Sequence, residues 1–309
     1  MSQIISFCRP EFAEYFDLVY CCLPVYELLF SPMRNINVNN TMSFTFITAL
    51  YNISRDKYDQ RSYTEYQEWF SKTLSVPVPM VIYTEEENRI LIETIREKLP
   101  TRVIYTTLED TPFYHTRNEV EDIISKSDFK HKIKHPNGLE NRCYDYIPIV
   151  NSKFVWMNNA IEENYFKTDM HFWIDAGLSR FMKFNMNEDI FNKDLITELN
   201  KNNKIFIQIG KERELSDLIN EKIKFDDCIG QNINFMMAGF WGGNKDLIKE
   251  ICEIGKDMYI NEYINKRRVD NEQVIFGVII KKYFNQTYLI RNHTGQEYIN
   301  YYVFCNRLR

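Results

Sequence analysis

The repeated alternation of short apolar runs with segments of helical periodicity constrains the fold of this chain more than any other feature. Residues 43–51 form a strand-like run, and residues 64–74 carry apolar side chains at helical spacing. A strand at 80–83, a helix at 85–99 and a strand at 103–106 follow. Because parallel strands need a long crossover between them, the pattern predicts an α/β fold with a mostly parallel central sheet flanked by helices.

The second half of the chain continues this alternation. The predicted elements are a helix at 154–166, strands at 170–175, 204–209 and 233–240, and helices at 244–266 and 271–284. Residues 110–148 show no periodicity that assigns an element. A length of 309 residues suits one large domain, or two small ones that share a core. We predict a single domain over residues 41–309.

Residues 1–40 are predicted to form an N-terminal helical extension, because Ser31-Pro32 and a polar run at 35–40 separate them from the first strand. The apolar stretch 18–30 is interrupted by Pro24 and is too short to span a bilayer. It can be a helix packed on the domain or an amphipathic, peripheral contact with a membrane surface. We expect neither a signal peptide nor a membrane span.

Charge and cysteine usage limit the partners and the compartment. Lys and Arg number 38 against 43 Asp and Glu, mixed along the chain, so no basic face for a phosphate backbone is expected. The seven cysteines lack the spacing of a zinc site or of a dense disulfide framework. We therefore expect reduced thiols, a cytoplasmic protein and no nucleic-acid partner.

One acidic residue stands at the end of an apolar strand, in the segment Phe172-Trp173-Ile174-Asp175-Ala176-Gly177. A carboxylate buried at such a place needs a cation, a metal ion or hydrogen-bond donors. The small residues that follow leave room for a diphosphate and its metal ion to approach the backbone. The same aspartate can instead cap the following turn.

Two further segments place candidate residues at element ends. The run 237–244 is predicted as a strand that stops before Gly242 and Gly243, where the backbone can approach a ligand closely; a glycine turn without a ligand is the alternative. Asp270-Asn271-Glu272-Gln273 begins the last long helix, where these residues either serve a site or only cap the helix.

The histidines argue against metal-dependent hydrolysis. None of the five has the spacing of a zinc hydrolase, and the chain lacks the Gly-x-Ser-x-Gly turn of a serine hydrolase. His293, near the C-terminus, remains a candidate ligand.

Taken in order, several segments of this chain resemble the HtrL/YibB (WlaTC) family. They are Phe46 to Arg55, Arg61, Tyr66, Trp69-Phe70, Val81 to Thr84, Trp173 to Gly177, Ala238 to Gly243, and Asp270 to Gln273. Proteins of this family resemble glycosyltransferases of the GT-A fold. The resemblance therefore implies a GT-A-like domain that uses a nucleotide-sugar donor such as a UDP-sugar, a glycan or glycoconjugate acceptor, and a place in polysaccharide biosynthesis.

The resemblance also implies which residues bind the donor. They are Thr48, Ala49, Tyr51, Arg55, Arg61, Trp173, Asp175, Ala176, Gly177, Arg180, Gly242 and Gly243. In related enzymes an Asp-x-Asp motif holds Mn²⁺ or Mg²⁺, but the matching triplet here has glycine in place of the second acid. A metal ion would need Asp175, His293 and the diphosphate as ligands. Without one, Arg55, Arg61 or Arg180 would neutralise the diphosphate.

Sugar transfer also needs a group at the acceptor side. Asp270 or Glu272 would be the base of an inverting enzyme, and the same acid or Gln273 would stabilise the oxocarbenium charge in a retaining one. Two other functions agree with the same pattern. One is a catalytically silent nucleotide- or glycan-binding protein, and the other is a different nucleotide-using transferase.

Overall fold

A seven-stranded sheet runs through the part of the chain that the computed structural model describes, which is residues 44–126, 128–291 and 297–307. The order across the sheet is β3-β2-β1-β4-β6-β5-β7. The strands are β1 (Phe44–Leu50), β2 (Met80–Thr84), β3 (Thr101–Tyr105), β4 (Met170–Ile174), β5 (Ile205–Ile209), β6 (Met236–Asn244) and β7 (Thr287–Ile290). Strand β6 pairs antiparallel with β4 and β5, and the other pairings in the described sheet are parallel.

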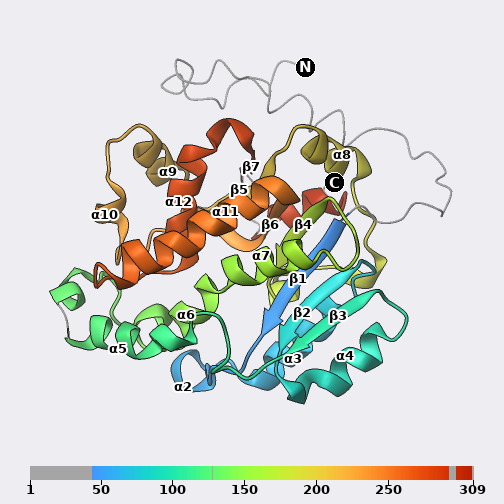
Figure 1. Cartoon of the computed structure of the whole chain (residues 1–309), viewed down its shortest axis with the longest axis horizontal. Helices are drawn as coiled ribbons and strands as arrows, with labels where there is room; N and C mark the ends of the chain where they lie inside the picture. The colour runs from blue at the N-terminus through green and yellow to red at the C-terminus, as the bar shows by residue number, and fades with distance from the viewer. Residues whose placement is uncertain (1–43, 127, 292–296, 308–309) are drawn as a thin grey trace.

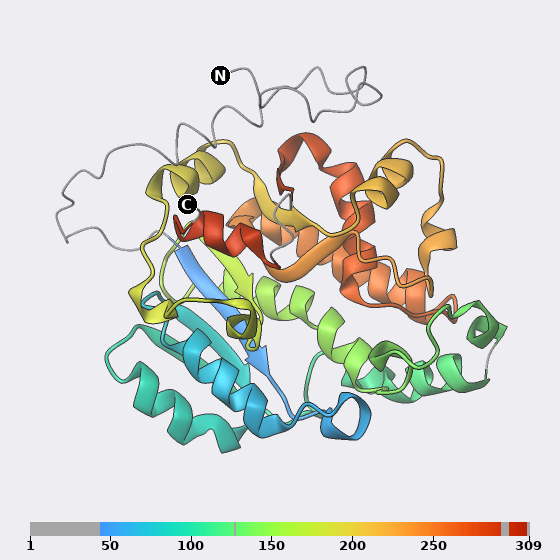
Figure 2. The same ribbon diagram turned by 180° about the vertical axis from the view of Figure 1, so that it is seen from behind.

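Helices cover both faces of this sheet, as the two opposite views show (Figures 1 and 2). On one face lie α7, α11 and α12, and on the other lie α3, α4, α8 and α13. The described α-helices are α2 (Asp56–Asp59), α3 (Tyr63–Leu74), α4 (Arg89–Arg96), α5 (Arg117–Lys126), α6 (Tyr146–Asn151), α7 (Lys153–Glu163), α8 (Lys193–Lys201), α9 (Glu212–Ile219), α10 (Phe225–Cys228), α11 (Lys245–Met258), α12 (Glu272–Lys282) and α13 (Ile299–Phe304). The predicted α/β class, with a mostly parallel sheet between helices, is confirmed.

The strands feed two separate apolar cores because successive side chains of a strand point to opposite faces. In β1, Phe46 packs with the α3 and α13 side of the sheet, whereas Ile47 packs with the α7 and α11 side. In β4, Phe172 and Trp173 divide in the same way. Burial on both faces explains why these strands are continuous apolar runs in the sequence rather than alternating ones.

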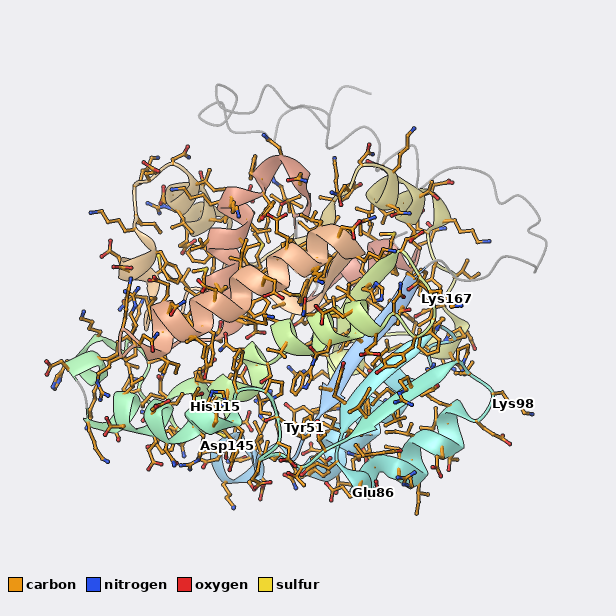
Figure 3. The ribbon with its side chains drawn as sticks, in the orientation of Figure 1. Tyr51, Glu86, Lys98, His115, Asp145 and Lys167 are labelled. Atoms are coloured by element: carbon orange, nitrogen blue, oxygen red, sulfur yellow. The ribbon has the colours of Figure 1, made fainter. Side chains whose placement is uncertain are left out.

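The sheet also sets which residues meet at its edge. Strands β1 and β4 are adjacent and parallel, with Phe46 opposite Phe172, so their carboxyl ends lie side by side. Tyr51 lies where the chain leaves β1 (Figure 3), and Asp175 directly follows β4. Ligands of open α/β sheets bind outside the carboxyl ends of strands, so this edge is the place to look for a site.

Several boundaries differ from the sequence predictions. Strand β6 continues to Asn244 instead of ending at Phe240, because its glycines pair within the sheet. Strand β7 and helix α5 had no predicted counterpart. The predicted N-terminal extension, residues 1–40, lies outside the described residues.

Two smaller expectations concern thiols and membranes. Cys143, Cys228, Cys252 and Cys305 are free and buried, as expected of reduced thiols. In the described parts of the chain, no helix combines the length and the apolarity needed to cross a bilayer.

Candidate functional site

A cavity of about 230 Å³ opens at the carboxyl edge of β1 and β4. Its walls come from the loop after β1, the loop after β4, helix α7 and the first turn of α12. The antiparallel strand β6 closes one side, since the Asp175 amide donates to the Gly239 carbonyl at 2.8 Å. Segments distant in sequence therefore converge on one space, as a binding site of this fold requires.

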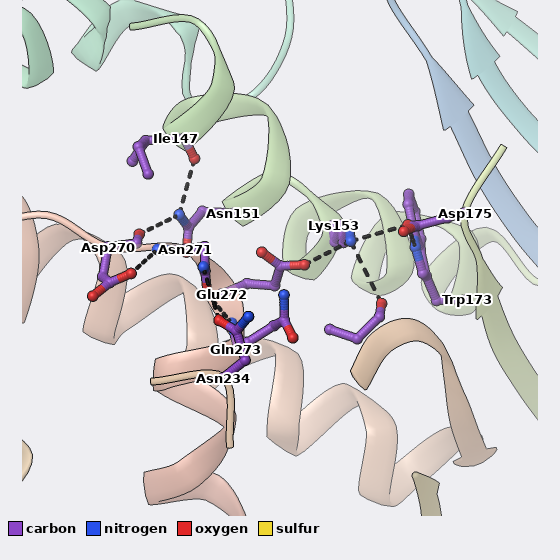
Figure 4. A network of polar contacts seen from close by, with 11 residues as sticks. Ile147, Asn151, Lys153, Trp173, Asp175, Asn234, Asp270, Asn271, Glu272 and Gln273 are labelled. Atoms are coloured by element: carbon purple, nitrogen blue, oxygen red, sulfur yellow. Dashed lines mark hydrogen bonds and ion pairs between the residues drawn. The ribbon is translucent and has the colours of Figure 1, made fainter. Parts of the chain in front are cut away.

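The centre of the cavity wall is a buried ammonium group between two carboxylates (Figure 4). Lys153, the first residue of α7, places its Nζ 2.6 Å from Glu272 Oε1 and 3.0 Å from Asp175 Oδ1. The Lys153 and Glu272 side chains are only 8 % and 3 % exposed, whereas the Asp175 side chain is 36 % exposed. Asp175 is thus the carboxylate that the group presents to the cavity.

The charges of this group change the pKa values of Lys153 and Glu272. Burial alone would lower the pKa of Lys153, but the charges of Asp175 and Glu272 raise it above its ordinary value, so the ammonium stays protonated. Burial raises the pKa of Glu272, and the charge of Lys153 opposes that rise. The indole Nε1 of Trp173 donates to Asp175 Oδ1 at 2.7 Å and fixes the carboxylate from a second side.

Three arginines add positive charge around the same space, namely Arg55, Arg61 and Arg180. Arg55 forms an ion pair with Asp59, and Arg61 lies 3.7 Å from the same carboxylate. Arg180 stacks over the rings of Trp69 and Phe181. The lining contains four Lys and Arg residues, 55, 61, 153 and 180, and two acids, 175 and 272, so its formal charge is 4 − 2 = +2.

Aromatic rings form much of the remaining wall. Tyr51 and Trp156 stack with ring centroids 5.5 Å apart, and Trp156 stacks in turn on Trp173 at 6.1 Å. The ring of Tyr298, the residue before α13, packs against Gly239 of β6, where an added Cβ would lie 2.6 Å from that ring. Glycine at 239 is therefore what lets Tyr298 reach the cavity.

Most of the residues predicted to bind the donor or to act in catalysis line this cavity. They are Ala49, Tyr51, Arg55, Arg61, Trp173, Asp175, Ala176, Gly177, Arg180, Glu272 and Gln273. Thr48 is not among the lining residues, because it is fully buried within β1.

The sequence places Gly242 and Gly243 in the donor site with Asp175, but neither glycine lines the cavity that contains Asp175, and that placement is wrong. In β6 they pair with Phe172 and His171, on the side of β4 away from Asp175. A Cβ on Gly242 would lie 2.3 Å from the His171 carbonyl oxygen, and one on Gly243 would lie 2.3 Å from that of Lys204. These glycines allow neighbouring strands to pack closely, and Gly239 is the glycine of this strand that faces the cavity.

Asp270 also lies apart from the cavity, although Glu272 and Gln273 do not. Its carboxylate accepts from the amides of Asn271 (Figure 4) and Gly230, both at 2.8 Å. Asp270 lines a separate, much smaller hollow. Burial raises its pKa to about 7. Asn271 caps α12 through the Gln273 amide, as the capping interpretation predicts.

The described residues do not fit a divalent metal ion at Asp175. Its Oδ1 is already engaged by Lys153 and Trp173, which leaves Oδ2 as its single free oxygen, and no three described His, Cys, Asp or Glu side chains group together as a metal site needs. His293, the other predicted ligand, lies outside the described residues.

Trp156, Gly239 and Tyr298 line the cavity without having been predicted as site residues, and Lys153 is the charged lining residue that sequence reasoning missed. It precedes the apolar run of α7, and a helix-start lysine is normally a solvated one. The available signal was its spacing: Met157 and Ile161, four and eight residues later, are buried core residues of the same helix face. A lysine on a buried face needs acidic partners, and here it has two.

Comparisons with known proteins give the family. Protein HtrL of Escherichia coli (strain K12) is 26 % identical over 264 residues, 81 % of this chain and 89 % of that protein. Mouse xyloside xylosyltransferase 1 superposes with a TM-score of 0.41 at 9 % identity, over 86 % of this chain and 93 % of that one. The 4-diphosphocytidyl-2C-methyl-D-erythritol synthase of Anaerococcus prevotii gives 0.36 at 10 % identity, over 84 % and 93 %. These two scores are too low to support an argument about this chain.

The family itself is defined without an activity, as a bacterial protein of unknown function. Its model matches residues 42–304, which include all the strands and the whole cavity lining described above. The chain belongs to the HtrL/YibB family.

Proposed function

We propose that this protein is a glycosyltransferase that moves a sugar from a nucleoside diphosphate donor, such as a UDP-sugar, to a hydroxyl of a glycan, lipid-linked glycan or protein. The observation that supports this most is the composition of the cavity. It combines a positively charged lining, aromatic walls and one partly exposed carboxylate at the carboxyl edge of a mostly parallel sheet.

The positive side of the cavity suits the diphosphate. One guanidinium group can donate to two phosphate oxygens at once. Arg55 and Arg61 reach the cavity from the segment after β1, and Arg180 reaches it from the segment after β4. They would stabilise the charge that develops on the leaving diphosphate as the sugar departs. The flat faces of Tyr51 and Trp156 suit a base or a sugar ring nearby.

Asp175 suits the sugar and hydroxyl side of the reaction. Its Oδ1 is held by Lys153 and Trp173, and within the described part of the chain no contact engages Oδ2. In our proposal Oδ2 accepts a hydrogen bond from a reacting or neighbouring hydroxyl. Glu272 lies behind Lys153 and holds that ammonium in place.

A panel of nucleotide sugars tests the proposal. At a ligand concentration of 100 times Kd, binding to the folded state adds about 2.7 kcal/mol of stability, which a thermal-shift assay detects readily. Release of free nucleoside diphosphate in the presence of an acceptor would identify the enzyme. Stabilisation without release of nucleoside diphosphate from the donor, whichever acceptor is added, would instead favour a silent binding protein, and no stabilisation by any nucleotide sugar would reject both.

A further inference from the structure

We infer that Lys153 balances the two site carboxylates in the place where a divalent cation would otherwise lie, so that this cavity takes its anionic ligand without a metal ion. The identity of that ligand as a nucleoside diphosphate rests on the proposed function. The inference about the cation rests on the geometry of Lys153, Asp175 and Glu272 alone.

Lys153 occupies the space between Asp175 Oδ1 and Glu272 Oε1, so a second cation cannot bind these two facing oxygens together. Its three N–H donors are directed to Asp175 Oδ1 at 3.0 Å, Glu272 Oε1 at 2.6 Å and the Ala238 carbonyl at 3.4 Å. Mn²⁺ or Mg²⁺ bound to the same carboxylate oxygens would lie about 2 Å from them, directly against the ammonium. The repulsion between the two cations would be strong in this poorly solvated place.

Lys153 is also fixed where it is, so a metal ion does not simply displace it. It belongs to α7, and the next residue, Phe154, is fully buried against Gly255 of α11. The ammonium lies 5.6 Å from the centre of the Trp173 ring, and its side chain is 8 % exposed. Moving it away would leave the buried Glu272 carboxylate without its partner, which is costly.

The rest of the cavity supplies the charge that a metal ion would otherwise bring to a diphosphate. With Lys153 counted, the lining has a formal charge of +2, and Asp59, which pairs with Arg55 and Arg61 from outside the lining, reduces the local charge to +1. Three of its four cations are arginines, whose planar groups bind phosphate oxygens in pairs. The site therefore has a charge basis for binding a diphosphate by itself.

The first test uses the wild-type protein and MnCl2 alone, with no nucleotide present. Titration calorimetry and the electron paramagnetic resonance of free Mn²⁺ are expected to show no site of one Mn²⁺ per chain. One-to-one binding that disappears in Asp175→Asn would overturn the inference. Because no nucleotide is used, this result stands even if the proposed function is wrong.

The second test removes the counter-ion. Lys153→Ala leaves two facing carboxylates, so the variant is expected to gain one Mn²⁺ per chain and to be stabilised by that ion. Lys245→Ala, which removes a lysine paired with Asp169 outside the cavity, is the matched control and is expected to gain none. A folded Lys153→Ala variant that binds no Mn²⁺ would contradict the counter-ion role. If this variant does not fold, the titration of the wild-type protein with Mn²⁺ decides whether the role holds.

The third test measures affinity for UDP and a UDP-sugar with EDTA and with excess Mn²⁺. The two dissociation constants are expected to agree within about twofold, which is below 0.5 kcal/mol. A loss of affinity of about tenfold or more on chelation would overturn the inference. If neither nucleotide binds under either condition, the proposed function fails, while the titration with Mn²⁺ alone still decides whether Lys153 takes the cation's place.

Discussion

Glu272 shows how much of a site residue's effect is structural. Its carboxylate is buried with Lys153, and the pair joins α12 to α7. Glu272→Gln keeps the size of the side chain but removes one of the charges that the ammonium needs. We expect the free energy of unfolding to fall by about 1.5–3 kcal/mol, the range for hydrogen bonds to charged groups.

Urea denaturation checks this expectation for Glu272. Glu253→Gln is the control, because its exposed pair with Lys256 should contribute less than about 1 kcal/mol. Equal losses in the two variants would show that the Lys153 pair contributes no more than a surface pair.

For Asp175 the expected effect is on turnover, whereas for Glu272 it is on stability. Since its exposed oxygen faces the cavity, Asp175→Asn should lower turnover by about two to four orders of magnitude, the usual effect of removing one acid or base. The sequence alone predicts a loss of donor affinity as well, through a metal ion. Because Lys153 rather than a metal ion contacts Asp175, we no longer expect that loss of donor affinity. Nucleotide affinity should change by less than about threefold.

Calorimetry with a nucleotide sugar and an assay of nucleotide release separate the two parts of the Asp175 prediction. A variant that turns over normally would remove Asp175 from the reaction. An Asp175→Asn variant that no longer binds the donor would instead support the interpretation that Asp175 holds a metal ion.

Asp270 gives the folded protein a pH dependence of its own. Its pKa is about 7 when folded, because of burial, against 3.8 for the free side chain. Between about pH 4 and pH 7 the folded state keeps a proton that the unfolded state has lost, so stability falls as pH rises, by at most about 1.4 kcal/mol per unit. Below this window both states are protonated, and above it the loss is complete.

The Asp270→Asn variant lacks this titration. The free energy of unfolding of Asp270→Asn minus that of the wild type should therefore increase between pH 4.5 and pH 7.5, values chosen to span about that window. Urea denaturation at the two pH values measures it. A difference that does not change with pH would mean that Asp270 ionises normally in the folded chain.

At the level of elements, the sequence predicted those strands and helices whose apolar pattern is visible in a short segment of the chain. The strands β1, β2 and β4 are apolar runs buried on both faces, and helices α3 and α11 have clear apolar stripes, so all five were predicted. Strand β7 has four residues, too few for a period to show. The end of β6 was misplaced because glycines at 242 and 243 suggest a turn, and only the neighbouring strands reveal that they pair.

The glycines of β6 and of the loop after β4 should respond differently to alanine. In Gly242→Ala the added Cβ would meet backbone atoms of β4 at 2.3–2.5 Å, which cannot move independently of the sheet. We expect a loss of about 1–3 kcal/mol in the free energy of unfolding, typical of overpacking. In Gly177→Ala the Cβ would meet side-chain rings instead of backbone, that of Tyr66 at 3.3 Å and that of Trp69 at 3.5 Å, so stability should hardly change.

The same two variants distinguish packing from binding. Gly177 lines the cavity and Gly242 does not, so only Gly177→Ala should weaken nucleotide binding by the folded protein. Urea denaturation and calorimetry measure the two effects. A stable Gly242→Ala protein with weakened binding would restore this glycine to the site.

At the scale of the whole molecule, the site depends on contacts that no local pattern contains. Lys153 and Glu272 are 119 residues apart, and they meet only because α7 and α12 pack on the same face of the sheet. Asp175 was predicted because it combines a strand end with an acid, both visible in one short segment. The reversed direction of β6, which brings Gly239 rather than Gly242 to the cavity, is likewise visible only in its antiparallel pairing with β4 and β5.

The predicted boundary at residue 41 divides the chain into an extension and a domain, and the domain alone should bind the donor. Among the described residues, those that line the cavity lie between Ala49 and Tyr298, and we propose that residues 1–40 contribute nothing to donor binding. A chain starting at Thr41 should bind a nucleotide sugar within about twofold of the full-length affinity. Arg180→Met in the full-length chain is the comparison, because it removes a lining cation and should weaken binding by about tenfold, near 1.4 kcal/mol. Calorimetry measures affinity, and a thermal melt shows whether the shortened chain is folded. A folded chain without affinity would place part of the site within the first forty residues, and the domain boundary at residue 41 would then be wrong.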